Sequence, residues 1–533
     1  MSDFLLRLPK ALYSADQVKQ LDNLAIQSFN IPGFALMQRA GAIAFETIKQ
    51  RWPHIRFLRV FAGCGNNGGD GFIVAALATV AGLNCEVIVL GDTNTLRGDA
   101  AAAFETAQQA GVNFRHFAEF VTPTALQQEV ITVDALFGTG LDRPVSGEYA
   151  QAIQQMNASQ GPVLAIDIPS GLHSDTGMPM GSAVKADITV SFIGLKQGML
   201  TGQGQDFCGE ILFSDLELPA EVYLAQTAPK SAVQRFDIND ATRHFMPRPR
   251  SAHKGCNGHV VIVGGDTGYG GAVIMAAEAA LRGGAGLVSI VTRSVNRSAA
   301  LARCPELMVC GTEDSSLQAP SQAKDWTSVE ALLDRATALV VGPGLGKGKW
   351  SQQLFALVLK ASRTNNLPLV IDADALHLLV DRQALLSGLQ AMPWVLTPHP
   401  GEAAALLSIN TAEIQRNRFD AVRTLVATYH CTCLLKGSGT LIGEVSANSP
   451  VTLCTEGNPG MGSGGMGDVL SGIIGSFLAQ GLSCSDAAKA AAAVHGEAAD
   501  LAARAQGERG LKATDLLDFV RQLVNPTVSP HPY

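Results

Sequence analysis

The sequence predicts an α/β protein of two domains, each built on a mostly parallel sheet with helices on both faces. Three observations support this fold class. The chain of 533 residues is too long for one hydrophobic core, so two or three domains are expected. Apolar strand runs alternate with helical patterns, which is typical of parallel sheets buried on both faces. The 55 glycines favour tight loops whose backbone approaches ligands closely.

The first half opens with two expected helices, around residues 14–29 and 33–50. Buried strands follow, with helical patterns such as GFIVAALATVAG between several of them. The strand runs are FLRVFAG (57–63), CEVIVLGD (85–92), VITVDALFG (130–138), PVLAIDIPSG (162–171), ADITVSFIG (186–194) and GEILFSDL (209–216). We assign residues 1–225 to this first domain.

The second half restarts the same pattern after an aperiodic stretch at about 220–235, where we place the domain boundary. Its strand runs are GHVVIVGG (258–265), GLVSIVT (286–292), ALVVGPGLG (338–346), LPLVIDADAL (367–376), PWVLTPHPGE (393–402) and CTCLLKGSGT (431–440). An alanine-rich helix is expected near the end, at 485–505. We assign residues 235–525 to this second domain.

Composition excludes several classes of protein. The net charge of −8 provides no basic surface, so a nucleic-acid partner is not expected. No apolar run of about 18 residues predicts a membrane span. The ten cysteines show neither a C-x-x-C pair nor zinc-ligand spacing, which is typical of reduced thiols. Because the opening residues also lack a signal-peptide pattern, we expect a soluble cytoplasmic protein.

The stretch GCGNNGGDGF, residues 63–72, fits the dinucleotide-binding fingerprint G-x-G-x-x-G after a strand. That fingerprint also needs an acidic residue about 20 positions further on, and Glu86 comes too early while Asp92 comes too late. Asp70 lies at the expected start of the helix, where it would compete with a pyrophosphate for backbone N–H groups. We therefore do not expect the usual dinucleotide mode. The simplest alternative is that Asp70 is only a helix cap beside turn-forming asparagines.

Polar residues also follow other strands of the first half, namely Asp134, Asp167 and Ser170. Because the carboxyl ends of parallel strands share one edge of a sheet, these side chains should converge with the Asn66–Asn67 turn. Carboxylate, amide and hydroxyl oxygens suit a hard cation. The residues alone leave the choice between K⁺ and Mg²⁺ open. Lys196, after another strand, is interpreted as an ordinary surface lysine rather than a phosphate ligand.

The second glycine-rich loop, NPGMGSGGMGD at 458–468, leads directly into an apolar helix. Small residues at a helix start present free N–H groups to an anion, and Asp468 beside them can take a hydroxyl proton. No G-x-x-x-x-G-K-[ST] motif is present, so a Walker-type ATPase is excluded. The loop could instead be a plain turn capped by Asp468. Asp372 and Asp374 either hold Mg²⁺ or simply end a strand.

The motifs GCGNNGGDGF, VDALFGTGL and AIDIPSGLHSDTG, in this order, resemble the NAD(P)H-hydrate epimerase domain. The resemblance covers nearly the whole first half and implies a Rossmann-like fold without the usual dinucleotide mode. It implies K⁺ binding by Asn67, Asp134 and Ser170, and acid/base catalysis by Asp167. The implied substrate contacts are Asn66, Asn67, Gly68, Gly69, Asp70, Gly138, Thr139, Gly140, Leu141, Asp142, Arg143, Pro144 and Asp167.

The segments GGDTGYGGAVIMAAEAALRGGAGLV, VVGPGLG, VIDADAL, TPHPGEAAALL, LLKGSGT and GSGGMGD resemble the ADP-dependent NAD(P)H-hydrate dehydratases, which have a ribokinase-like fold. They cover most of residues 250–505. The resemblance implies ADP as co-substrate, Mg²⁺ as cofactor and Asp468 as a catalytic residue. The implied nucleotide contacts are Lys436, Gly437, Ser438, Gly439, Thr440 and Gly467. The implied substrate contacts are Ala272, one of Gly344 and Gly346, His399 and Asp468.

Together the two resemblances predict a fused repair enzyme for hydrated NADH and NADPH, expected to form a homo-oligomer. The first domain would interconvert the R and S hydrates, and the second would convert the S hydrate with ADP into NAD(P)H, AMP and phosphate. Two other interpretations remain open. A small-molecule kinase with a regulatory first domain predicts a stable phosphorylated product. A non-catalytic first domain predicts that Asp167→Ala leaves all chemistry unchanged.

Overall fold

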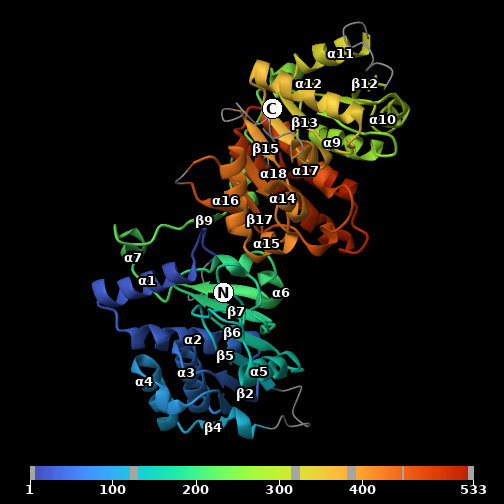
Figure 1. Ribbon diagram of the computed structural model, residues 1–533. Coiled ribbons are helices and arrows are strands. Elements are labelled where there is room, and N and C mark those ends of the chain that lie inside the picture. The colour runs from blue at the N-terminus through green and yellow to red at the C-terminus, as the bar shows by residue number, and fades with distance from the viewer. Residues whose placement is uncertain (1–6, 121–129, 314–323, 381–391, 447–448, 526–533) are drawn as a thin grey trace, which may run out of the picture. The chain divides into compact units, whose positions relative to one another are not determined.

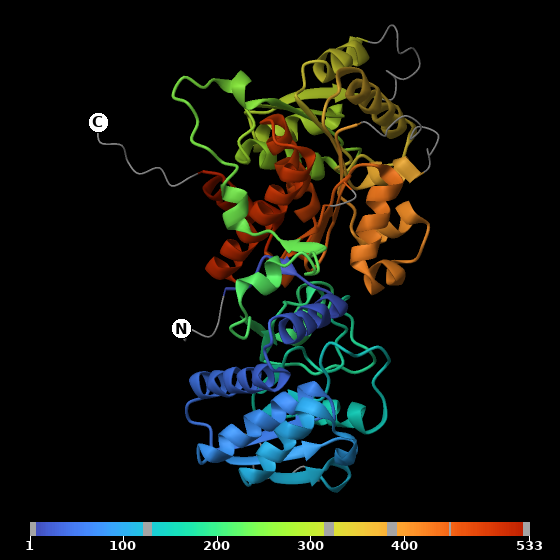
Figure 2. The ribbon, with the colours of Figure 1, turned by 90° about the vertical axis from the view of Figure 1, so that its left-hand side faces the viewer.

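The computed structural model describes residues 7–120, 130–313, 324–380, 392–446 and 449–525 (Figures 1 and 2). The chain divides into two compact units, Met1–Gln234 and Arg235–Tyr533. Each unit has its own mostly parallel sheet, so the predicted α/β class is confirmed. Among the helices that the structure describes, none is both long enough and apolar enough to span a bilayer.

The sheet of the N-terminal unit has the strand order β4-β3-β2-β5-β6-β7-β8, with every neighbouring pair parallel. The strands are β2 (Phe57–Ala62), β3 (Asn84–Val89), β4 (Asn113–His116), β5 (Val130–Ala135), β6 (Val163–Ile166), β7 (Ile188–Phe192) and β8 (Glu210–Ser214). All six predicted strand runs therefore form strands. The edge strand β4 escaped prediction because its sequence, NFRH, is mostly exposed and polar.

Helices cover both faces of this sheet, and the two expected at the start of the chain are confirmed as α1 and α2 (Figure 1). The helices are α1 (Ala15–Ser28), α2 (Gly33–Arg51), α3 (Asn66–Val80), α4 (Gly98–Gln109), α5 (Gly147–Asn157), α6 (Gly204–Cys208) and α7 (Ala220–Leu224). Helices α1 to α4 share one apolar core with the sheet, while α5 packs into a second one. This double burial accounts for the continuous apolar strands.

A short antiparallel pair lies outside these layers. Strand β1 (Ala11–Leu12) pairs with β9 (Val233–Arg235), so that Leu12 lies opposite Val233. Each strand is too short to show an alternating pattern, and neither was predicted from the sequence. The pair brings the start of the chain next to residues more than 200 positions away.

The sheet of the C-terminal unit runs β18-β17-β16-β15-β14-β13-β10-β11-β12. Strands β10 to β16 are parallel, whereas β16, β17 and β18 form antiparallel pairs. The strands are β10 (His259–Val263), β11 (Leu287–Arg293), β12 (Met308–Thr312), β13 (Ala338–Val341), β14 (Leu369–Ile371), β15 (Trp394–Leu396), β16 (Thr432–Leu435), β17 (Thr440–Gly443) and β18 (Val451–Cys454). Strands β12, β17 and β18 were not predicted.

The helices of this unit are α8 (Ile238–Thr242), α9 (Gly270–Arg282), α10 (Arg297–Arg303), α11 (Lys324–Leu333), α12 (Lys349–Asn365), α13 (Asp374–Val380), α14 (Pro400–Leu407), α15 (Thr411–Arg416), α16 (Arg418–Tyr429), α17 (Met466–Ala479), α18 (Cys484–Gln506) and α19 (Leu517–Leu523). Helix α17 is almost wholly buried and packs very closely on α9. A Cβ at Gly472 would lie 2.0 Å from the carbonyl oxygen of Ala276, so this approach requires glycine. The packing fixes where α17 begins.

Candidate active sites

In the N-terminal unit, the strand order reverses between β2 and β5. Ligands of open α/β sheets bind at the carboxyl ends of the strands at such a switch point. A cavity of about 890 Å³ lies at this edge. The predicted substrate contacts that line it are Asn66, Asn67, Asp70, Gly138, Thr139, Gly140, Leu141 and Asp167. The other predicted contacts, Gly68, Gly69, Asp142, Arg143 and Pro144, are not among its lining residues.

The glycine loop after β2 passes into helix earlier than expected. Helix α3 begins at Asn66, with Gly65 as its extended N-cap residue, so the prediction that Asp70 starts the helix is wrong. Gly68 allows this tight passage, because a Cβ there would lie 1.9 Å from the carbonyl oxygen of Gly63. Asp70 lies in the second turn of α3. It therefore lines the cavity instead of capping the helix.

Three further acidic residues, Asp16 and Asp22 of α1 and Asp99 of α4, line the same cavity and were not predicted. Burial raises the pKa of Asp22, and the charges of Asp167 and Asp99 raise it further. Burial likewise raises the pKa of Asp70 well above its usual value, with contributions from Asp167 and Asp22. A sequence signal for Asp22 does exist. It lies four residues after buried Val18, on the apolar face of α1. A carboxylate is unusual on such a face and indicates a functional role.

The three residues predicted to bind K⁺ lie close together, around the backbone of Phe137. The carbonyl oxygen of Phe137 accepts a hydrogen bond from Asn67 Nδ2 (2.9 Å), and the Phe137 N–H donates to Ser170 Oγ (2.8 Å). Buried Asp134 accepts from Ser170 Oγ (2.6 Å) and the Ser170 N–H (2.7 Å). Burial raises the pKa of Asp134 to about 6, against the effect of these hydrogen bonds. Asn67 Oδ1 is buried without a hydrogen-bond partner, so the cluster retains an acceptor that a cation would satisfy.

Asp167 follows β6 in a left-handed backbone conformation, with φ of 70°. Few side chains other than asparagine and aspartate tolerate this region, and strain of this kind concentrates at functional sites. Its Oδ1 pairs with the ammonium group of Lys196, whose side chain is 0% exposed. The interpretation of Lys196 as a surface lysine is therefore wrong. The carboxylate and the buried cation form one unit at the cavity wall.

The C-terminal unit has a corresponding switch point between β10 and β13. The loops that follow these two strands are bonded to each other through their backbones. The Gly265 N–H donates to the carbonyl oxygen of Pro343 (2.9 Å), and the Asp266 N–H donates to that of Gly344 (2.7 Å). A Cβ at Gly264 would lie 2.0 Å from the Pro343 oxygen. The glycines of GGD and GPGLG thus allow two loops to touch where a ligand would bind.

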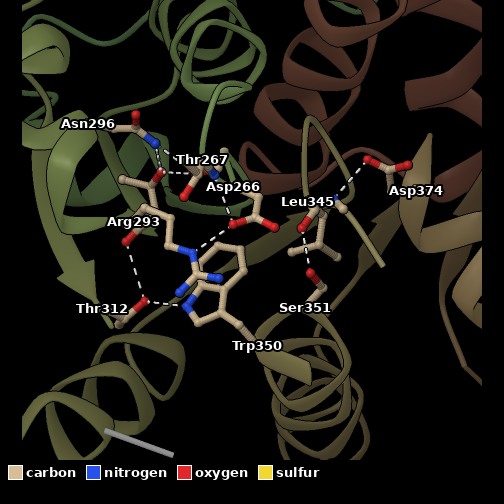
Figure 3. A network of polar contacts seen from close by, with 12 residues as sticks. Asp266, Thr267, Arg293, Asn296, Thr312, Leu345, Trp350, Ser351 and Asp374 are labelled. Carbon is tan, nitrogen blue, oxygen red and sulfur yellow. Dashed lines mark hydrogen bonds and ion pairs between the residues drawn. The ribbon is translucent and has the colours of Figure 1, made fainter. Parts of the chain in front are cut away.

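Side chains of neighbouring elements hold the same two loops in place (Figure 3). Asp266 Oδ1 accepts from Arg293 Nε (2.7 Å), and the Arg293 guanidinium stacks 4.3 Å from the Trp350 ring centroid. Trp350 Nε1 in turn donates to Thr312 Oγ1 (2.9 Å). On the other side, the Gly346 N–H donates to Asp374 Oδ2 (2.8 Å). Asp374 therefore holds the GPGLG loop in place, and the hydrogen bonds of this network restrain both loops.

Of the two candidate glycines in GPGLG, Gly344 lies beside another predicted substrate contact. A Cβ at Gly344 would lie 3.1 Å from the Cβ of Ala272, whereas one at Gly346 would meet Asp266. The Gly346 N–H is also already bonded to Asp374. The geometry favours Gly344 as the residue next to Ala272.

Asp468 lies in the first turn of α17, where the sequence predicted a catalytic carboxylate. The N-cap residue of α17, Gly465, has a φ of 94°, a conformation that glycine adopts without strain. Burial raises the pKa of Asp468 to about 7, and the charge of Asp372 adds to the increase while Lys436 opposes it. A carboxyl group poised near neutrality is suited to general-base work.

Lys436 lies beside this helix start, because a Cβ at Gly467 would lie 3.2 Å from its Nζ. Its ammonium group pairs with Asp372 (2.9 Å) and Glu402 (3.7 Å). The pKa of Lys436 is raised overall, because the effect of these two carboxylates exceeds the opposing effect of burial. Asp372 accepts from Ser471 Oγ with its second oxygen (2.6 Å). Both of its oxygens are thus engaged within the protein.

The predicted nucleotide loop, Lys436 to Thr440, joins β16 to β17 in a β-hairpin, and Thr440 is already the first residue of β17. Arg418, only 1% exposed, lies under this turn. Its guanidinium donates to the carbonyl oxygens of Leu435 (3.4 Å), Lys436 (3.3 Å) and Gly439 (3.2 Å). Sequence reasoning missed Arg418, since nothing before the fold links it to the turn.

His399 has a clear local role. Its Nδ1 accepts from the N–H groups of Gly401 (3.0 Å) and Glu402 (3.2 Å) and so caps α14. The side chain is 56% exposed, and its Nε2 lies 3.5 Å from Glu402 Oε1. Among the described residues, no group of three or more His, Cys, Asp or Glu side chains is arranged to hold a metal ion.

The fold and the two sites define a two-domain α/β enzyme with a paired carboxylate and lysine after the carboxyl ends of strands in each sheet. Residues 33–198 match the family model described as YjeF-related protein N-terminus, and residues 260–522 match the one described as NAD(P)H-hydrate dehydratase. The chain belongs to the family of bifunctional NAD(P)H-hydrate repair enzymes, as its similarity to whole relatives shows.

Two such relatives carry the name bifunctional NAD(P)H-hydrate repair enzyme Nnr. The protein from Coxiella burnetii is 42% identical over 516 residues, covering 97% of this chain and 99% of the relative. The protein from Escherichia coli K12 is 38% identical over 522 residues, covering 98% and 95%. A solved ribokinase-like superfamily protein from Enterococcus faecalis is 28% identical, covering 56% of this chain and 99% of its own, with a TM-score of 0.48.

Proposed function

We propose that this chain returns hydrated NADH and NADPH to usable coenzymes through two activities. The N-terminal unit interconverts the R and S hydrates. The C-terminal unit uses ADP to convert the S hydrate into NAD(P)H, AMP and phosphate. The observation that carries the proposal is the match to whole bifunctional relatives along 97% of the chain, with a carboxylate–lysine site in each unit. A dehydratase that is selective for one epimer would leave the other epimer unrepaired. This explains why an epimerase domain is fused to it.

In the C-terminal unit, Asp468 takes the proton of the substrate hydroxyl as its oxygen attacks the β-phosphorus of ADP and the bond to AMP breaks. The N–H groups at the start of α17 face the transferring phosphoryl group. Phosphate then leaves with the electron pair of the C–O bond, and a ring proton is lost to restore the double bond. Phosphorylation is needed because hydroxide is a poor leaving group and phosphate a good one.

We propose that Mg²⁺ enters this site with ADP and is held mainly by the phosphates, as is usual for nucleotide sites. Asp372 does not fit a ligand role, because its charge is already paired with the Lys436 ammonium at 2.9 Å. The ion would neutralise phosphate charge during transfer. Lys436, next to Gly467, adds a second positive charge at the same place.

In the N-terminal unit, Asp167 acts as the acid/base group at the hydrated carbon. Epimerisation requires loss and return of hydroxide, or opening and closing of the ring. Either route needs a proton to leave and come back, which a positioned carboxylate can arrange. The cavity beside Asp167 is large enough, at about 890 Å³, for a nucleotide-sized ligand.

We propose K⁺ as the cofactor of the N-terminal unit, bound by Asn67, Asp134 and Ser170. The unpartnered Asn67 Oδ1 and the buried Asp134 carboxylate fit such a cation. We expect Asp134→Asn to increase the K⁺ concentration for half-maximal epimerisation by about tenfold or more, because the charged ligand is lost. The measurement is a KCl titration of R-to-S conversion in choline chloride at constant ionic strength. Equal wild-type rates with and without K⁺ would contradict the assignment.

The pH dependence of dehydration should report Asp468. A general base works only when ionised, and the pKa of Asp468 is raised to about 7 by burial and by Asp372. The rate should therefore fall as the pH decreases through this value, to about a tenth of its plateau at about pH 6. Initial rates with pure S hydrate and saturating ADP measure this limb. A rate that stays constant down to about pH 6 would exclude Asp468 as the base.

The whole proposal is tested with a mixture of R and S hydrates of NADH, ADP, Mg²⁺ and K⁺. Recovery of the reduced-nicotinamide absorbance should be complete with the wild-type protein. A phosphorylated product that accumulates without phosphate release would favour the small-molecule kinase instead. No recovery with ADP untouched would overturn the repair function.

The proposal includes a cytoplasmic location and self-association, without nucleic-acid or membrane partners. All ten cysteines are free thiols, as in proteins of a reducing compartment. The large apolar side chains of Val80, Leu224 and Met246 are at least 75% exposed and are candidates for a subunit contact. Light scattering after gel filtration would measure the oligomeric state.

A further inference from the structure

Lys196 pairs with Asp167, which lines the epimerase cavity, and its own side chain is fully buried. Its ammonium group donates to three acceptors: Asp167 Oδ1, Ser191 Oγ (3.1 Å) and the Phe192 carbonyl oxygen (3.0 Å). An ammonium has three protons, so these acceptors satisfy it fully. Lysine is almost never fully buried unless it is paired. No hydrogen of Lys196 remains for a ligand.

Asp167 divides its two carboxylate oxygens between the protein and the cavity. Oδ1 accepts from Lys196 and from the Phe192 N–H (3.3 Å). Oδ2 is directed toward the loop predicted to bind substrate, since a Cβ at Gly138 would lie 3.7 Å from it. The side chain of Asp167 is 18% exposed, in contrast to that of Lys196. One oxygen is therefore fixed by the protein, and the other faces the ligand.

The backbone holds this pair from both strand ends. Asp167 follows β6 with φ of 70°, and Ile193 follows β7 with φ of 62°. A β-branched residue in this region is strained and persists only where the surroundings impose it. Backbone bonds from Tyr13 fix the segment on both sides of Lys196, through the Leu195 oxygen (2.9 Å) and the Gln197 N–H (3.0 Å). The backbone of Lys196 is thus fixed by hydrogen bonds of both neighbouring residues.

Other charged groups face Asp167 from neighbouring elements. Asp70 of α3 and Asp99 of α4 line the same cavity, as do Asp16, Lys19 and Asp22 of α1. Burial and then the charge of Asp167 raise the pKa of Asp70, while Lys196 opposes that increase. Without Lys196, the carboxyl groups of Asp22, Asp70 and Asp167 would share the cavity with no buried cation to offset their repulsion.

We propose that Lys196 is the positioning residue of the epimerase site, which locks Oδ1 of Asp167 so that Oδ2 alone exchanges the proton with substrate. This inference rests on the function proposed above. Oδ2 takes the hydroxyl proton at the hydrated carbon, the O–H pair forms the carbonyl, and the C–N pair moves to the ring nitrogen. The nitrogen then attacks the other face of the carbonyl, and the proton returns to oxygen. Lys196 itself does not touch the substrate.

The test compares Lys196→Met, Asp167→Asn and the double variant in conversion of pure R hydrate without ADP. We expect Lys196→Met to lower kcat about 100-fold with KM unchanged, as for a misplaced catalytic group. The double variant should be no slower than Asp167→Asn alone, because Lys196 acts only through Asp167. Lys185→Met is the matched control, since Lys185 is an exposed lysine of the same unit outside the cavity lining and its loss should spare epimerisation.

A second measurement separates positioning from folding. Thermal unfolding of each variant shows whether the N-terminal unit is intact. In Lys196→Ala, added methylammonium should restore part of the epimerisation by replacing the charge, whereas methanol of similar size should not. Wild-type kcat in Lys196→Met, a raised KM with unchanged kcat, or equal rescue by methanol would overturn the inference. Absence of R-to-S conversion by the wild-type protein would instead overturn the proposed function, and this inference with it.

Discussion

Asp468→Asn is expected to lower ADP-dependent dehydration of the S hydrate by about 10²- to 10⁴-fold, while R-to-S conversion stays at the wild-type rate. Asparagine preserves the size of the side chain in the first turn of α17 but cannot take the hydroxyl proton. The N–H groups at the helix start and the Lys436 charge remain, so ADP should still bind. The measurement is recovery of reduced-nicotinamide absorbance from pure S hydrate.

Asp486 offers a matched control for this variant. It lies in the first turn of α18, as Asp468 does in α17, but is bonded to the helix-cap residue Ser483 away from the site. Asp486→Asn should keep wild-type activity. Dehydration that survives in Asp468→Asn would remove the base from the mechanism. Loss of ADP binding in that variant would indicate a role in nucleotide binding instead.

The parts of the fold that the sequence predicts are those with local signals. Continuous apolar runs marked the buried strands of both sheets, and the polar residues after them had to meet at one edge. This is why Asp134 and Ser170 could be placed together before their hydrogen bonds were seen. The short strand β17 escaped because TLIG directly follows the glycine turn GSG and shows no separate period.

The parts that escaped prediction depend on contacts between distant residues. Burial of Lys196 requires the left-handed turn at Ile193 and a backbone bond to Tyr13, more than 180 positions earlier. Lys436 meets Asp372 across 64 positions, and this pairing turns a predicted nucleotide contact into part of a buried charge cluster. Long-range ion pairs leave no periodic signal in a sequence. They decide the electrostatics of both sites.

Asp167→Asn is expected to lower R-to-S conversion by about 10²- to 10⁴-fold, since the amide cannot exchange the proton. With mixed hydrates, ADP and Mg²⁺, recovery should then stop at the S portion, followed by a slow tail from spontaneous epimerisation. Dehydration of pure S hydrate is the internal control and should be unchanged. Full recovery at the wild-type rate would support the alternative in which the first domain is only a binding module.

This variant also leaves Lys196 buried beside a neutral group, and breaking a buried ion pair costs about 3–5 kcal/mol of stability. Thermal unfolding should therefore show a less stable N-terminal unit in Asp167→Asn. Adding Lys196→Met removes the unpaired cation, so the double variant should regain stability while remaining inactive in epimerisation. If stability returns but epimerisation does not, the loss of activity is due to the missing carboxylate and not to unfolding. Epimerisation that returns with stability would show that Asp167 is structural.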